Sequence, residues 1–275
     1  MELHLKVSCC LNCFVILFIE IKNKTHQYDD TPEGVSFVQM FLLFFPRTII
    51  DLILEETNKR LGTPADLGEF LRFIGIILFI ATQSSINRRE YWSHRLVSIE
   101  YGAPYRFHEW MSGARFEKIM SSLTLTDEAP PAYKDKFWEV RKMISLWKEN
   151  MASIFSCAWA SCLDESMSIW LNKWTCPGWV FCPRKPHPFG NEYHTICCGL
   201  SGVLFDMEMV EGKDQPKELK NKHKEQNKYG TTCGLLMRLC KTMYSTGKSG
   251  LCLIIFILFY DFSINHLTNP LTTRR

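Results

Sequence analysis

The sequence has little net charge for its size. Its 32 Lys and Arg residues stand against 29 Asp and Glu residues, which leaves a formal charge of +3 over 275 residues. A chain with this balance is not a polycation, so a nucleic-acid-binding surface has to come from local clusters of Lys and Arg. With 46% hydrophobic and 13% aromatic residues, the chain can still bury a sizeable core. We therefore expect a globular protein.

Long apolar runs and a complete secretion signal are also missing. The run GLCLIIFILFY, Gly250–Tyr260, is too short for a transmembrane helix, which needs about 20 residues, and fits a buried strand better. An N-terminal run ending at Ile19 imitates the apolar part of a signal peptide. However, Glu2 precedes it, and Glu20 follows where a small-residue cleavage site would be expected. We expect no membrane partner and no secretion; the alternative of a secreted or membrane-tethered protein requires this run to direct translocation.

The 12 cysteines do not form a paired metal-binding motif. The one CxxC motif, Cys10 to Cys13, has no second CxxC or spaced His pair to complete a tetrahedral zinc site, and Cys176 and Cys182 are isolated. Many of the cysteines lie inside apolar runs, as buried free thiols do. The pattern indicates a reducing compartment and no thiolate metal site.

Apolar residues recur at helical spacing from Val35 to about Phe155. The segment DLGEFLRFIGIILFIATQ is apolar on all sides and is expected to be a core helix. Gly62 offers a C-terminal stop for the helix before it. The first half is thus predicted to be helical, with helices in the segments 47–62, 66–83, 112–125 and 137–155.

Beyond Ser156 the pattern changes to short runs with strand character. Ser201 and Gly202 supply a turn between two of these runs, which predicts a hairpin. A helical pattern then precedes the last apolar run, so the predicted order is strand, strand, strand, helix, strand. The strands are expected in 157–170, 193–200, 202–210 and 250–260, and the helix in 231–244.

This order predicts a mixed sheet in which the strand after the helix runs parallel to the first strand. It is the opening of a ribonuclease H-like fold. We therefore predict an α/β protein in which a helical N-terminal region precedes a partial ribonuclease H-like sheet. The predicted units are a poorly defined segment 1–34, the helical region 35–155, the partial catalytic core 156–261 and a tail 262–275.

Two adjacent carboxylates, Asp164 and Glu165, lie in the apolar stretch SCLDESMSIW. If the stretch is a strand, they point to opposite faces, and only one can join a given cluster. An acid on the first strand would lie beside the end of the strand that follows the helix, and such carboxylate clusters suit Mg²⁺ or Mn²⁺. The alternatives are a helix start capped by Ser161 or Asp164, or a hairpin turn.

Several motifs in register carry a resemblance to piggyBac-type transposases. In the sheet region they are LDESMSIW and the stretch PRKPHPFGNEYHTICCGLSGVLFDMEMVEGK. In the helical region, EETNKRLG, FLRFIGIILFIATQSSINRREYWS, MSGARFEKIMSSLTLTDE and DKFWEVRKMI are similar to the same family, in the same order. The resemblance extends from about Ser36 to Lys248.

The resemblance implies a DDD-type enzyme that cuts and joins transposon ends in the nucleus with two divalent metals, Mg²⁺ or Mn²⁺. Its partners would be DNA and a second copy or a related transposase. Asp164 matches the first catalytic aspartate of the family, and Glu165 would be structural. The second aspartate is expected about five residues beyond the Lys of YSTGK, where this chain reads SGLCLI.

The first downstream acid is Asp261, so a metal site would consist of Asp164 and Asp261. The remaining residues do not hold the third aspartate or the family's cysteine-rich zinc module. The sequence therefore predicts a truncated, catalytically inactive transposase-derived protein. The alternatives are an active strand-transfer enzyme that recruits Asp261 with Asp206 or Glu208, and a domesticated DNA-binding or interaction protein.

Basic residues near the acids are the candidates for DNA contacts. Arg184, Lys185 and His187 could bind phosphates, although the prolines around them also fit a rigid loop whose charges are only solvated. His194 fits a satisfied core or edge histidine better than a ligand. The aromatics Trp170, Trp174 and Trp179 could stack on bases, but packing is their commoner use.

Overall fold

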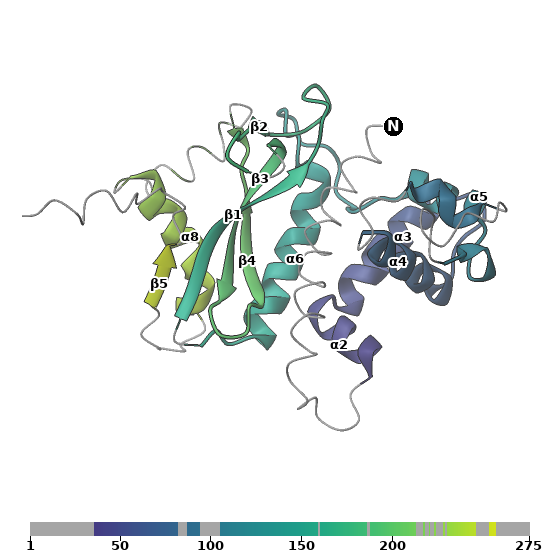
Figure 1. Cartoon of the computed structure of the whole chain (residues 1–275), viewed down its shortest axis with the longest axis horizontal. Helices are drawn as coiled ribbons and strands as arrows, with labels where there is room; N and C mark the ends of the chain where they lie inside the picture. The colour runs from purple at the N-terminus through teal and green to yellow at the C-terminus, as the bar shows by residue number, and fades with distance from the viewer. Residues whose placement is uncertain are drawn as a thin grey trace, which may run out of the picture.

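The computed structural model describes residues 36–81, 87–93, 105–158, 160–185, 188–212 and 230–245, single positions 217, 220, 223 and 228, and the backbone of 253–256. Helices dominate the first half and a mixed sheet the second (Figure 1). Before the sheet come α2 (Phe37–Phe44), α3 (Arg47–Asn58), α4 (Leu67–Ala81), the 3₁₀ turns η1 (Arg88–Trp92) and η2 (Phe107–Glu109), α5 (Gly113–Ser122) and α6 (Trp138–Ile154).

The four predicted helices of the first half are present as α3, α4, α5 and α6. In α3, α5 and α6 the apolar positions bury one face, as the spacing predicts, and α4 buries five of its apolar residues. Two helices end earlier than predicted, since α3 stops at Asn58 rather than near Gly62 and α5 stops at Ser122. The Asn58 side chain accepts a hydrogen bond from the backbone N–H of Ala65 (2.8 Å) and donates one to its carbonyl oxygen (2.9 Å). These bonds stabilise the loop that leads to α4.

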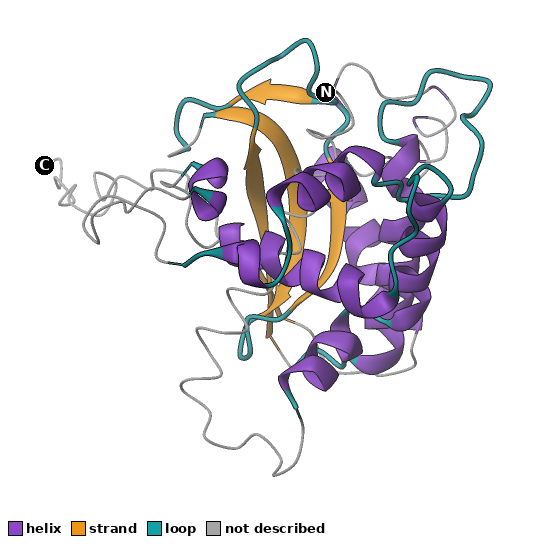
Figure 2. Cartoon of the chain, turned by 90° about the vertical axis from the view of Figure 1, so that its right-hand side faces the viewer, coloured by secondary structure: helices purple, strands orange, loops and turns teal. Residues whose placement is uncertain are grey.

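Helix α6 connects the helical region with the sheet. The Trp147 side chain at its centre is fully buried. On one side, the Asn150 side-chain amide donates to the carbonyl oxygen of Leu43 in α2 (2.9 Å). On the other, Lys148 reaches strand β4 (Leu204–Met209), where its Nζ lies 2.7 Å from a carboxylate oxygen of Asp206. Figure 2 shows the helices gathered against the curved sheet.

The sheet has five described strands in the order β2-β3-β1-β5, with β4 paired to β3. Strand β3 is antiparallel to β1, and β5 is parallel to β1. The hairpin predicted from 193–200 and 202–210 is present as β3 and β4, and its turn contains Gly202 at a φ of 68°. A three-residue strand, β2, was not predicted because it is too short to show a periodic pattern. The strands are β1 (Ala160–Ile169), β2 (Trp179–Phe181), β3 (Phe189–Cys198), β4 and β5 (Leu253–Phe256).

Helices cover both faces of the sheet. Helix α8 (Thr231–Ser245) follows β4 in the chain and precedes β5, so the predicted strand, helix, strand succession is confirmed. Its Arg238 pairs with Glu208 on one face of β4. On the opposite face, Phe155 after α6 stacks on Phe205 with ring centroids 5.8 Å apart. Figure 1 shows β1, β3 and β4 between α8 and α6.

Close packing between β1 and β3 depends on Gly190. Its φ is +154°, and a Cβ atom there would lie 1.8 Å from the carbonyl oxygen of Ser168. A larger residue at this position would push the two strands apart. Within the described ranges, no helix has both the length and the apolar character needed to cross a bilayer. The N-terminal run and the segment after Phe256 lie outside the described residues.

Candidate functional site

Asp164 and Glu165 lie in the middle of strand β1, where they face opposite sides of the sheet. Across the antiparallel pairing with β3, Asp164 is opposite Thr195 and Glu165 is opposite His194. Both residues are exposed. The alternatives of a helix cap or a hairpin turn at this position are therefore wrong, because the stretch is one continuous strand.

Asp164 is positioned by short-range backbone contacts. One of its carboxylate oxygens accepts a hydrogen bond from the N–H of Glu165 at 2.7 Å. Its carbonyl oxygen accepts one from the Thr195 hydroxyl at 3.2 Å. The last described pair between β1 and β5 is Leu163 opposite Phe256, one residue before Asp164. The end of β5 thus lies beside the carboxylate, at the edge where the predicted second acid would be needed.

The other predicted ligands divide into those outside and those inside the described ranges. Asp261 and His187 lie outside the described residues. Asp206 is fully buried and paired with Lys148, and Glu208 is held by Arg238 through two contacts of 2.6 and 2.7 Å. The strand register also puts both acids on the face opposite to Asp164. The hypothesis that Asp206 or Glu208 joins Asp164 in one site is therefore wrong.

Of the described basic residues that were predicted to bind DNA, Lys185 contacts strand β1, at Glu165. Arg184 is exposed, and Lys185 is half-buried. The Lys185 ammonium donates a hydrogen bond to the backbone carbonyl oxygen of Glu165. This contact ties the loop before β3 to the centre of β1.

Of the three tryptophans, two have structural roles. The Trp170 indole N–H donates to the Thr175 hydroxyl (3.0 Å), and that of Trp179 donates to the carbonyl oxygen of Trp170 (3.2 Å). Trp174 is 82% exposed, and the Lys173 ammonium lies 4.7 Å from the centroid of its ring. Only Trp174 thus presents its ring to solvent among the three.

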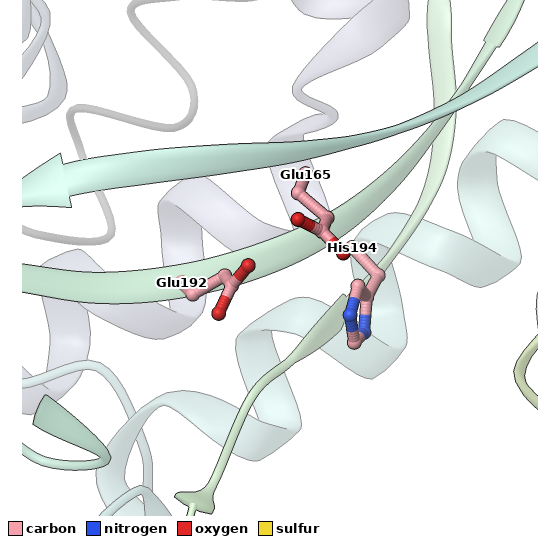
Figure 3. Close-up of side chains that lie close together, drawn as sticks. All are labelled: Glu165, Glu192 and His194. Carbon is pink, nitrogen blue, oxygen red and sulfur yellow. The ribbon is translucent and has the colours of Figure 1, made fainter. Parts of the chain in front are cut away.

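A second group of polar side chains gathers on the Glu165 face. A carboxylate oxygen of Glu165, one of Glu192 and a ring nitrogen of His194 all lie within 4.8 Å of one another. Figure 3 shows the two carboxylates and the imidazole close together on adjacent strands. The sequence-based prediction gave Glu165 a structural role, treated His194 as a satisfied histidine and did not consider Glu192.

The electrostatics of this group follow from burial and from like charges. Burial, followed by the nearby charge and hydrogen bond of Glu165, raises the pKa of Glu192 to about 7, while Lys185 opposes the rise. Burial lowers the pKa of His194 against the opposing influence of Glu208 and Glu165, and Arg238 lowers it further. At neutral pH the imidazole is therefore uncharged, with a lone pair available on one ring nitrogen.

One signal in the sequence could have pointed to this group. Glu192 and His194 are two residues apart in a strand-like run, so alternation puts both on one face. Their meeting with Glu165 depends on the register between β1 and β3, which the long connection 170–188 does not reveal.

Comparisons with known proteins match the chain to one family. A family model described as Transposase IS4 matches residues 36–253. The human PiggyBac transposable element-derived protein 3 is 26% identical over 212 residues, which are 73% of this chain and 32% of that protein. The chain belongs to the piggyBac transposase-derived family. The human chimeric ERCC6-PGBD3 protein matches at the same identity over 18% of its length.

A solved structure of the family has the same fold. The piggyBac transposase of a synaptic complex with hairpin DNA matches 86% of this chain and 54% of its own with a TM-score of 0.58, at 14% sequence identity. The piggyBac-derived chain described here thus spans about a third of the human protein 3 and about half of this transposase.

DDD transposases of this family generally use divalent metals. The question is therefore whether the described residues around Asp164 could hold such an ion. Among the described residues, Asp164 belongs to no group of three donors close enough to share an ion. These residues alone therefore do not form the family's metal site around Asp164.

Proposed function

We propose that this piggyBac-derived chain binds DNA and has a ribonuclease H-like sheet. We further propose that it has lost the DNA strand-transfer activity of its ancestor. The strand order β4-β3-β1-β5, with β5 parallel to β1, supports the ribonuclease H-like assignment. The proposed division is a helical region 35–155 and a partial catalytic core 156–261. A nuclear location is part of the proposal, because DNA is the partner.

The position of Asp164 carries the proposal of lost catalysis. Its carboxylate stands at the end of the β1–β5 pairing, where a second acid on the chain after β5 would complete a metal site. From Lys248 onward the first acid in the sequence is Asp261, well beyond the position where the family has its aspartate. A two-metal reaction at the DNA phosphate needs several carboxylates to hold both ions, and a single carboxylate cannot hold them. Mg²⁺ or Mn²⁺ is therefore proposed as the cofactor of the ancestral transposase and not of this chain.

The retained DNA contact would come from the loop before β3. Arg184 is exposed there, and Lys185 lies beside it at the surface of the sheet. Lys and Arg side chains neutralise phosphates and supply most of the sequence-independent affinity for DNA. The exposed ring of Trp174, with Lys173 next to it, adds a surface on which an unpaired base can stack. A second copy of the chain or a related transposase is the proposed protein partner.

Two assays on the full chain test the proposal. In fluorescence anisotropy with a labelled duplex, the double variant Arg184→Ala/Lys185→Ala should bind more weakly than the wild type and show a smaller salt dependence. Lys59→Ala/Arg60→Ala, which removes two exposed basic side chains just after α3, is the matched control. Equal binding by the double variant and the wild type would contradict the DNA-binding role.

The second assay measures nicking of supercoiled plasmid with Mg²⁺ or Mn²⁺. The proposal expects no nicking above the level of the Asp164→Asn variant. Nicking that disappears in both Asp164→Asn and Asp261→Asn would instead establish the active enzyme that recruits Asp261.

A further inference from the structure

We propose that Glu165, Glu192 and His194 form a binding site for a divalent transition-metal ion, on the face of the sheet opposite to Asp164. The proposal goes beyond the function proposed above and does not depend on it. The observation behind it is that three donors from two adjacent strands lie within 4.8 Å of one another (Figure 3).

The strand pairing makes the site rigid. Glu165 is directly opposite His194 in the β1–β3 register, and Glu192 is the next residue on the same face of β3. A metal bound at about 2.1 Å from each donor holds neighbouring donors about 3 to 3.5 Å apart. The three atoms would have to approach by up to about 1.5 Å, which rotations of the two glutamate side chains achieve without moving the backbone.

The donor set determines the kind of ion. Two carboxylate oxygens with one imidazole nitrogen suit Mn²⁺, Fe²⁺, Co²⁺ or Zn²⁺, whereas Mg²⁺ prefers oxygen ligands alone. The set differs from the carboxylate cluster expected around Asp164 and uses none of its residues. It also contains no cysteine, so it differs from the zinc module of the family.

The surrounding charges leave room for a cation. Three carboxylates face the site from the sheet, namely Glu165, Glu192 and Glu208. Two cations accompany them, because Arg238 binds both oxygens of Glu208 and Lys185 binds the backbone of Glu165. When all three acids are ionised, one negative charge is in excess. A divalent ion between Glu165 and Glu192 would relieve the repulsion between two carboxylates that face each other on the sheet.

Mn²⁺ titration of the full-length protein, followed by electron paramagnetic resonance of the free ion, tests the site. Mn²⁺ is the probe because carboxylate and imidazole bind it better than thiolates do, so the cysteines interfere little. We expect Glu192→Gln and His194→Ala to weaken Mn²⁺ binding by at least about tenfold. Asp164→Asn, a carboxylate change on the same strand but the opposite face, should leave this binding unchanged.

Binding of Mn²⁺ that is the same in the wild type, Glu192→Gln and His194→Ala would overturn the proposal. No binding by the wild type, or binding lost only in Asp164→Asn, would also overturn it. A loss of Mn²⁺ binding in Glu192→Gln would not come from misfolding, because this variant removes one of several neighbouring negative charges and should be at least as stable as the wild type. Thermal unfolding of each variant checks this point. The plasmid assay measures nicking and the titration measures Mn²⁺ binding, so either proposal can be refuted while the other stands.

Discussion

Replacing Glu192 by Gln should stabilise the protein at alkaline pH but not in acid. The pKa of this carboxyl is raised from 4.5 to about 7, mainly by burial and then by Glu165. Above about pH 7 the folded protein must carry the charge in a place that disfavours it, whereas the unfolded chain carries it at no cost. Between 4.5 and 7 the folded state therefore holds more protons, and the stability of the wild type falls as the pH rises through this range.

The structure sets a ceiling on the size of this effect. A pKa raised from 4.5 to about 7 corresponds to at most about 3 kcal/mol of lost stability at alkaline pH. Because Glu192 is only half-buried, solvent screens part of the repulsion, and we expect about 1 to 2 kcal/mol. Gln keeps the size and a hydrogen-bonding amide but removes the charge. Its advantage over Glu should thus grow from near zero at about pH 4 to its full value at about pH 8.

Urea unfolding followed by tryptophan fluorescence at the two pH values measures the difference. Glu55→Gln is the control, because Glu55 is exposed on α3, away from the sheet, and should change stability by little at either pH. Adding Glu165→Gln to Glu192→Gln should give little further gain, since the repulsion is already gone. A Glu192→Gln protein that is destabilised at about pH 8, or equally stabilised at both values, would refute this account of the cluster.

Two further stability predictions concern buried polar groups. Arg141 pairs with Asp135 and with Glu211 (2.9 Å), whose carboxylates are 1% and 9% exposed, so Arg141→Met should cost about 3 kcal/mol in urea unfolding. The exposed pair of Arg47 with Asp51 is the control, and Arg47→Met should cost no more than about 0.5 kcal/mol. Among the described residues, the buried hydroxyl of Tyr91 has no hydrogen-bond partner. Tyr91→Phe should therefore add about 1 kcal/mol, seen as a higher melting temperature; a lower one would indicate a partner.

The helices could be predicted from the sequence because their signals are local. In α5 and α6, apolar residues at three- and four-residue spacing are the residues that the fold buries. The end of α3 could not be placed in the same way. It depends on Asn58 bonding to Ala65 across a loop, which is a tertiary contact rather than a periodic pattern.

Four of the five described strands were predicted in type and order, but their register was not. Alternation correctly separated Asp164 from Glu165, since that requires only that the stretch be extended. Which residue of β3 lies opposite Glu165 depends on a connection of many residues between the two strands, whose shape sequence alone does not give. The same lack of register left Asp206 and Glu208 as candidate partners of Asp164, and the pairing of β4 with β3 removes them.

The two faces of β1 allow the two proposals to be separated by single substitutions. Asp164 shares its face of the sheet with Thr195 and Met207, whereas Glu165 shares the other face with His194 and with Glu208, which Arg238 of α8 binds. The backbone of the sheet lies between them, so a side-chain change on one face leaves the donors on the other in place. An ion bound at Glu165 would therefore persist in an Asp164 variant. The two proposals thus concern neighbouring positions of one strand, and the variants of one can be read without disturbing the other.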